Sequence, residues 1–420
     1  MTLALRQADW LNQARVIAYA RVLLAFELVL FLVCIAGTYG LIVPLKHPTT
    51  SDFVSFYAAG HLANSAAPWL VYNRAAHFAA EQAATARGIA YSQFYYPPVY
   101  LLVCGLLARL PYLAAFIVFQ ATTLLLCLIA VRVILPRVPV SVLLAFPPVF
   151  WTMGTGQNAF LSAALLAGAT TQLERRPVIS GLLIGALCYK PHLGLLIPVA
   201  LAAGGHWRTY AAAAASVAVL VLLSLAGFGW PTWHAFLLEA QGAGAVYAAP
   251  GAVDVAGYTS PFGMLMTFGV PPFVAGVLQG GVVAGSAVLV WIVWRRTTDI
   301  ALRSMMLLAA TQVAVPVLMF YDLMVLGVAM AWMVHRGLRD GFGPWEKLSL
   351  ACLFFIPLLS GNLNLGPHVV VGAVVALFGM LLACVIVRRS LVASIRYGGD
   401  TRSATRRLAL ANSMTAVPEA

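Results

Sequence analysis

The chain has 420 residues, of which 62% are hydrophobic and only 9% are charged. Soluble domains carry about a quarter charged residues, so this composition excludes a soluble protein and predicts an all-α, polytopic integral membrane protein. The net charge of +12 comes mostly from arginines in short loops and in the C-terminal tail. That placement fits the positive-inside rule better than nucleic-acid binding, so no nucleic-acid partner is expected.

The N-terminal part of the chain predicts a cytoplasmic start and one membrane crossing. Residues 1–21 contain three arginines and form a cytoplasmic segment. The apolar run that follows, as far as Pro44, is long enough to span a bilayer as an uncleaved anchor. It delivers residues 45–95 to the extracytoplasmic face. Within this loop, Phe53–Ala66 and Tyr72–Arg87 have mixed helical patterns that predict short helices lying on the membrane surface.

The remaining apolar runs belong to one transmembrane domain, residues 22–387, with about 10–13 helices. Several runs are shorter than a full span needs, and those bounded by Pro or Gly predict broken or re-entrant helices around a protein-lined cavity. Residues 388–420 lose hydrophobicity and gain arginine, which predicts a basic, partly disordered cytoplasmic tail in contact with membrane lipids. A multi-pass protein of the cell inner (plasma) membrane is expected.

Arginine clusters follow every second apolar run, which predicts that the polar islands between the other runs share one extracytoplasmic face. Arg109 does not fit this alternation unless residues 96–112 form a hairpin or the alternation shifts there. The segments predicted to share the face are residues 46–95, 156–158, 190–192, 229–258, 321–322 and the asparagines Asn362 and Asn364.

Asp52 begins the first polar island, Ser51-Asp52-Phe53, just past the first span. A carboxylate at the interface can take a proton from a group held in the membrane. Asp is also a favoured residue at a helix N-cap, and the two roles can coexist.

Two further islands allow both a structural and a ligand-binding interpretation. Tyr95-Tyr96-Pro97-Pro98 is typical of an aromatic girdle followed by a helix start, with tyrosines that could also face a sugar. Gly156-Gln157-Asn158 is typical of a tight turn, and its amides are also suited to sugar hydroxyls.

Lys190, followed by Pro191 and His192, lies inside a continuous apolar stretch. A charge at such depth usually marks a substrate path, and an ammonium suits a phosphate; the alternative is a side chain that snorkels to the interface. The last island, Tyr321-Asp322, could cap the next helix, pair with Lys190 or an arginine, or take part in catalysis.

These islands, in this order, resemble the polyprenyl-phosphate-mannose-dependent mannosyltransferases of glycosyltransferase family 87, within the GT-C superfamily. The resemblance runs from the first span to about residue 335. Its matching positions are Ser51-Asp52-Phe53, Tyr57, Val71-Tyr72-Asn73, Tyr96-Pro97-Pro98, Gly156-Gln157-Asn158, Lys190-Pro191 and Tyr321-Asp322. The family's usual Tyr-Asp step reads Tyr72-Asn73 here, so Asn73 receives no catalytic role.

The resemblance implies a GT-C-like helical bundle and a hexosyltransferase that uses a polyprenyl-phosphate-linked sugar, with mannose as the expected hexose. It implies Asp52 as the catalytic general base of an inverting transfer to a lipid or glycan acceptor. The chemistry of the islands agrees with it: Lys190 with His192 would neutralise the departing phosphate, and Gln157 and Asn158 would orient sugar hydroxyls. The residues expected to bind substrate are Tyr57, Tyr96, Gln157, Asn158, Lys190, His192, Tyr321 and Asp322.

Two other functions are compatible with the same sequence features. A polytopic transporter or lipid flippase would also carry intramembrane charge and broken helices, and a non-catalytic scaffold would tolerate the loss of Asp52. The chain has no Walker motif, no dinucleotide-binding glycine loop and no His/Cys cluster with metal-ligand spacing. The sequence therefore predicts neither a cofactor nor a metal ion.

Overall fold

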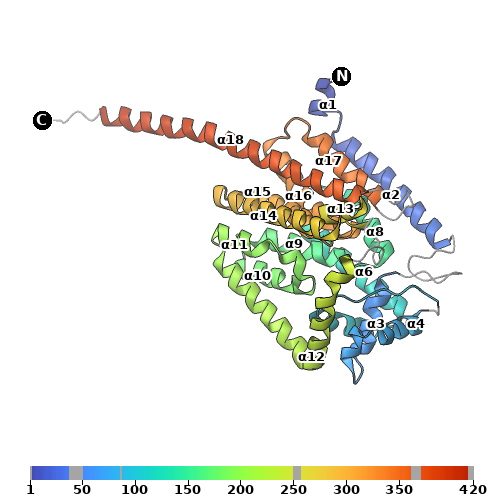
Figure 1. The fold of residues 1–420 in the computed structure, drawn as a ribbon. Coiled ribbons are helices and arrows are strands. Elements are labelled where there is room, and N and C mark those ends of the chain that lie inside the picture. Colours follow the sequence, from blue (N-terminus) through green and yellow to red (C-terminus); the bar gives the residue numbers. More distant parts are fainter. Residues whose placement is uncertain (1, 37–50, 86–87, 249–256, 361–369, 415–420) are drawn as a thin grey trace.

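The computed structural model describes residues 2–36, 51–85, 88–248, 257–360 and 370–414 (Figure 1). Within these ranges the elements are helices, and the one β pairing is an isolated bridge between Tyr258 and Met319. The predicted all-α class is confirmed. Four of the described helices are long and apolar enough to cross a membrane, namely Tyr112–Ile134, Trp207–Gly242, Pro272–Arg296 and Val371–Val392.

The first predicted span corresponds to α2 (Gln13–Ala36), which follows the short α1 (Thr2–Gln7). The rest of that span and the start of the loop, including Lys46, lie outside the described residues, as do Asn362 and Asn364.

The loop predicted to be extracytoplasmic folds into α3 (Phe53–Ala63), the 3-10 turn η1 (Pro68–Tyr72) and α4 (Arg74–Ala84). Both predicted helices are confirmed, but α3 does not have the mixed face expected of a surface helix. It is buried from Phe53 through Gly60, because α5 (Pro98–Leu107) lies directly against it. Gly60 permits this approach, since a Cβ there would lie 2.1 Å from the Cys104 carbonyl oxygen.

The position of α5 settles the side on which Arg109 lies. α5 has 10 residues and is about 15 Å long, half of what a bilayer crossing needs. The Tyr57 hydroxyl of α3 donates to the Leu110 carbonyl oxygen at 2.8 Å. Arg109 therefore lies beside α3, on the side of Asp52, and the later helices keep the predicted alternation of sides.

The chain then leaves this side in α6 (Tyr112–Ile134) and returns through α7 (Val140–Leu144) and α8 (Pro147–Thr155), which ends beside Asp52. It leaves again in α9 (Ala159–Gln172). Gly156 ends α8 with a left-handed φ of 69°, a conformation that glycine adopts without strain. The predicted tight turn at Gly156 is confirmed.

The apolar stretch around Lys190 is a broken helix, as its proline predicts. Its parts are α10 (Pro177–Ala186), the 3-10 turns η2 (Leu187–Tyr189) and η3 (Pro191–Gly194), and α11 (Ile197–Gly204). Lys190 has φ −125° and ψ 70°, outside the helical region, because the ring of Pro191 disfavours the helical conformation in the preceding residue.

α12 (Trp207–Ala248) continues through residues that were expected to form a loop. It consists of two helical parts that meet at Gly229, whose φ of 77° and ψ of 164° are not helical. The second part packs on the loop between α2 and α5: the Phe236 and Tyr72 rings lie 5.7 Å apart. The loop prediction for 229–248 is wrong in secondary structure, because the chain becomes helical again after the break at Gly229, with Pro231 in the first turn.

Two helices form the centre of the bundle. α15 (Ile300–Ala314) is buried from Ala301 to its end, and α16 (Leu323–Asp340) follows it after the turn η5 (Phe320–Asp322). α13 (Pro261–Thr267), α14 (Pro272–Arg296) and the first half of α18 (Val371–Met414) surround them. α18 runs on helically through the basic segment to Met414, where partial disorder was expected.

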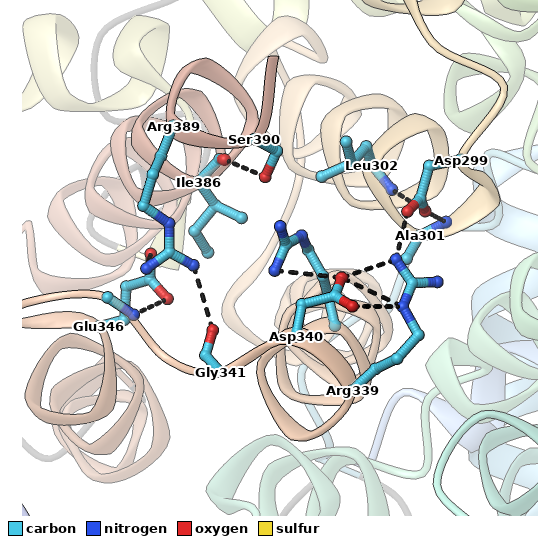
Figure 2. A network of polar contacts seen from close by, with 12 residues as sticks. Asp299, Ala301, Leu302, Arg339, Asp340, Gly341, Glu346, Ile386, Arg389 and Ser390 are labelled. Carbon is cyan, nitrogen blue, oxygen red and sulfur yellow. Dashed lines mark hydrogen bonds and ion pairs between the residues drawn. The ribbon is translucent and has the colours of Figure 1, made fainter. Parts of the chain in front are cut away.

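Ion pairs join the far ends of these helices (Figure 2). Arg339 at the end of α16 pairs with Asp299 and Asp340, and Arg389 of α18 pairs with Glu346 at 3.0 Å, the first residue of α17 (Glu346–Phe355). α16 has 18 residues and so is about 27 Å long. The network therefore lies about a membrane thickness away from Asp322, on the side predicted to be cytoplasmic.

Candidate functional site

Three hydrogen bonds join Asp52 to other segments of the chain. Its main-chain N–H donates to the Thr155 carbonyl oxygen at 2.8 Å. The Gln157 side-chain amide donates to Oδ2 at 2.7 Å, and the Ser92 hydroxyl donates to Oδ1 at 3.4 Å. Asp52 occupies the N-cap position of α3, but its side chain makes no capping bond. The carboxylate is therefore directed at the loop after α8 and at residue 92 rather than at its own helix.

The surroundings of Asp52 act on its pKa in opposite directions. Burial has the largest effect and raises the pKa of Asp52 above the ordinary value of 3.8, because a low-dielectric environment disfavours the anion. The hydrogen bonds from Gln157 and Ser92 and the positive charge of Lys190 lower it. The result is a partly exposed carboxylate that is more basic than one in water, which is a property of a general base.

Gln157 can donate to Asp52 because its amide oxygen is engaged on the other side. Oε1 accepts from the Asn158 main-chain N–H at 3.3 Å and from the Tyr96 hydroxyl at 3.4 Å. The Gln157 carbonyl oxygen also accepts from Gln120 at 3.1 Å. These contacts direct the Gln157 NH₂ group towards the carboxylate.

Tyr96 joins this group from the extended segment before α5. It does not form a membrane girdle, because its ring packs inside the protein, 4.8 Å from Tyr100 and 6.4 Å from Tyr189. Asn158 is fully buried, and its side chain lies near the hydroxyls of Tyr96 and Tyr100. The helix start predicted at Pro97-Pro98 is confirmed, since Pro98 is the first residue of α5.

Lys190 and Asp322 form a second part of the site. Lys190 Nζ lies 2.8 Å from Asp322 Oδ1, and both side chains are only 4% exposed. Lys190 Nζ also lies 5.5 Å from the centre of the Tyr321 ring, within the range of a cation–π contact. Lys190 does not snorkel, and of the alternatives that the sequence left open for Asp322 the structure shows pairing with Lys190. Asp322 makes no capping bond to α16.

The two parts are adjacent, because Tyr96 contacts both: its hydroxyl donates to Gln157, and its ring lies 6.4 Å from the ring of Tyr189, the residue before Lys190. His192 is next to the second part: its side chain is exposed, and the charges of Lys190 and Asp322 both reach its imidazole. Tyr57 is not brought into the group, since its hydroxyl is bound to the main chain at Leu110. Asn73 caps α4 by accepting from the Ala76 N–H at 3.0 Å, a structural role.

Three residues near Asp52 were not predicted from the sequence. Ser92 contacts the carboxylate directly, and its main-chain N–H donates to Glu81 Oε2 at 3.2 Å. Glu81 and His77 are both fully buried, with 3.6 Å between Oε1 and Nδ1. A signal was present, because His77 and Glu81 are four residues apart and so lie on the same face of a helix. Residues 51–53, 92 and 157 thus meet although they come from three separate polar segments.

The described residues contain no group of three or more His, Cys, Asp or Glu side chains placed to hold a metal ion. The sequence model of glycosyltransferase family 87 matches residues 94–319, more than half of the chain. The matched residues include Tyr96, Gln157, Asn158 and Lys190. Asp322 lies three residues beyond the match, and Asp52 lies 42 residues before it. Neither the search of curated proteins nor the search of solved structures found a match.

Proposed function

The chain belongs to glycosyltransferase family 87 and is a membrane glycosyltransferase, and from this premise we propose that it transfers a hexose, most simply mannose, from a polyprenyl-phosphate donor. The acceptor is a lipid or glycan hydroxyl on the extracytoplasmic face. The observation that carries the proposal is the Asp52 carboxylate, which is partly exposed, bound by Gln157 and Ser92, and influenced by the Lys190 charge. A base and a cation in one polar site are what transfer from a sugar phosphate requires.

The proposed reaction has one displacement step. Asp52 removes the proton from the acceptor hydroxyl, and the acceptor oxygen forms a bond to the anomeric carbon of the sugar. The bond between that carbon and the phosphate oxygen breaks, and its electron pair leaves with the polyprenyl phosphate. Attack from the side opposite the phosphate inverts the anomeric configuration, through an oxocarbenium-like transition state.

Lys190 is the proposed partner of the departing phosphate. Its ammonium is a buried point charge on a non-helical segment, and fixed positive charge stabilises the negative charge that develops on the leaving group. In the free enzyme this charge is balanced by Asp322. We propose that the phosphate shares Lys190 with Asp322, with His192 at the edge of the site, and that Gln157, Asn158, Tyr96 and Tyr321 orient the sugar.

The test is sugar transfer in proteoliposomes supplied with polyprenyl-phosphate mannose and a lipid acceptor. Asp52→Asn preserves size and the hydrogen bonds to the Asp52 main chain but removes the base, and we expect the transfer rate to fall by about 10²–10⁴-fold. Asp9→Asn is the matched control, because it removes the same charge from a side chain that is 76% exposed and bonded only to Lys347.

The transfer rate of Asp52→Asn decides whether Asp52 is the base. Loss of transfer in Asp52→Asn, with an intact control, supports the base. Near-normal transfer in Asp52→Asn excludes it. Movement of the intact donor across the membrane without its consumption would indicate a transporter or lipid flippase instead.

A further inference from the structure

The pair His77–Glu81 is buried although nothing in the proposed reaction uses it. Both side chains are 0% exposed, on a helix of only 11 residues that lies in the extracytoplasmic loop. Burial favours the neutral form of each side chain: it lowers the pKa of His77 to about 4 and raises the pKa of Glu81 to about 8. An apolar pair would attach α4 at least as well, because buried ionisable groups add little or no net stability.

The contacts of the pair lead to both sides of Asp52. The His77 ring nitrogen Nε2 lies 3.1 Å from the Ser55 carbonyl oxygen on α3, in the first turn of the helix that Asp52 precedes. Glu81 Oε2 accepts from the Ser92 main-chain N–H at 3.2 Å, and the Ser92 hydroxyl donates to Asp52 Oδ1 at 3.4 Å.

Ser92 uses two different groups for these two contacts. Its N–H faces Glu81 and its hydroxyl faces Asp52, so no chain of exchangeable protons connects the two carboxyls through Ser92. Glu81 therefore acts on Asp52 by holding the main chain, not by accepting its proton.

The segment around Ser92 is held by contacts with other elements. Residues 90–97 belong to no helix, so internal helical hydrogen bonds do not hold Ser92 in place. On one side, Gln93 donates to Glu239 of α12. On the other, the Tyr91 ring lies 5.7 Å from the His77 ring and 4.9 Å from the Arg74 guanidinium carbon. The Glu81 carboxyl adds a contact to the main chain of Ser92 itself.

We propose that Ser92 and Glu81 are positioning residues for Asp52: Glu81 holds the main chain of residue 92 so that the Ser92 hydroxyl stabilises the Asp52 anion. This inference rests on the proposed function, in which Asp52 is the base. The charged and titratable groups that face Asp52 are Lys190, Glu81 and Tyr96. A neutral Glu81 adds no second negative charge beside the base, which would otherwise oppose its ionisation.

The experiment measures kcat and the donor KM against pH for purified enzyme in proteoliposomes. Transfer falls on the acid side as Asp52 becomes protonated. Ser92→Ala removes one donor to the anion, so we expect its acid limb to move to higher pH by about 0.5–1 unit, with the donor KM unchanged. Ser92→Thr keeps the hydroxyl and should return the limb towards its original position.

A double-mutant cycle tests whether Glu81 acts through Ser92. Glu81→Ala should shift the limb in the same direction as Ser92→Ala, and the double variant should shift it no further than Ser92→Ala does, because both act through one hydroxyl. Glu81→Gln retains an acceptor for the Ser92 N–H and should leave the limb in place. Asn73→Ala is the matched control, since it loosens the start of α4 without touching the pair.

The inference is overturned if the acid limb of Ser92→Ala does not move, or if the shifts of the two single variants add up in the double variant. It is also overturned if the limb moves in Asn73→Ala, because any loosening of α4 would then have the same effect. If Glu81→Ala does not fold, Ser92→Ala and Glu81→Gln still decide between the outcomes. Failure of the proposed function is seen separately, as retained transfer in Asp52→Asn.

Discussion

Lys190 and Asp322 are 132 positions apart in the chain, and their charged groups are 2.8 Å apart in a buried ion pair. Each sits at a break between helices: Lys190 between two 3-10 turns, and Asp322 in the turn before α16. The pair therefore fastens the broken stretch 177–204 to the central helix of the bundle. A ligand that interacts with the Lys190 ammonium therefore also changes how residues 177–204 are attached to α16.

Removing one partner of the pair should destabilise the protein strongly. Lys190→Met leaves Asp322 buried without a counter-charge, and we expect a loss of about 3–5 kcal/mol. The double variant Lys190→Met/Asp322→Leu removes both charges and should recover most of that stability. Thermal unfolding in detergent measures both effects.

The same variants test the phosphate role. Lys190→Met/Asp322→Leu should remain folded yet show a raised KM for the lipid-phosphate donor. Unchanged donor KM in this stable double variant would move the phosphate site elsewhere, with His192 as the neighbouring candidate.

Gly156 should not tolerate a side chain. Its φ of 69° is left-handed, and a Cβ would lie 2.7 Å from the Phe53 Cβ, next to Asp52. Gly156→Ala should cost about 1–3 kcal/mol in stability and lower transfer further by displacing the base. Gly227→Ala is the control, because a Cβ at position 227 in α12 meets no atom within 4 Å. Equal activity in the two variants would contradict the prediction.

The stability of the protein should depend on pH through Glu81. Its folded pKa of about 8 lies above the model-peptide value of 4.5, so the folded state holds more protons than the unfolded state between these values, and stability falls as pH rises through that window. His77, with a folded pKa of about 4 against 6.5, has the opposite sign: stability falls as pH drops through its window.

The two effects oppose each other between about pH 4.5 and 6.5, and Glu81 acts alone from about pH 6.5 to 8. The expected slope there is at most about 1.4 kcal/mol per pH unit. Melting temperatures of the wild type and Glu81→Gln across this range test it: the difference between the two should change with pH, and a constant difference would rule out titration of Glu81.

The predicted sidedness can be checked by labelling single cysteines in a cysteine-free background. Ser65→Cys follows α3 and should react with a membrane-impermeant reagent from outside intact cells. Arg175→Cys follows α9 and should react only after permeabilisation. Both native side chains are exposed, so access from the water is the variable measured. External labelling at position 175 would contradict a site on the outer face.

Local residue chemistry made part of the fold predictable. Pro98 starts a helix, Gly156 turns one, and Pro191 breaks one, because each limits the backbone conformations available nearby. Alternating arginine clusters also predicted that the loops at Asp52, Gln157 and Lys190 share a face. Burial and loop shape were not predictable in this way: α3 packs against α5, and the chain becomes helical again after the break at Gly229 in α12.

The candidate site was only partly predictable from the sequence, because it is built by contacts between side chains that lie far apart in the chain. Pairing of Lys190 with Asp322 was one of several open alternatives, since nothing local chooses between them. Tyr57 matches a family motif, but its hydroxyl is bound to Leu110. Ser92 and Glu81 were missed because one lies in an irregular segment and the other in a short helix, and only the folded chain brings both to Asp52.

The hydrogen bond from the Asp52 N–H to the Thr155 carbonyl oxygen joins two main-chain groups, so it does not depend on which side chain occupies position 52. The base can therefore be removed chemically while its attachment to the loop after α8 persists. This makes Asp52→Asn suitable as a trap: incubated with both donor and acceptor, it should accumulate the unreacted ternary complex. Cryo-electron microscopy of that complex would identify the acceptor directly from its density.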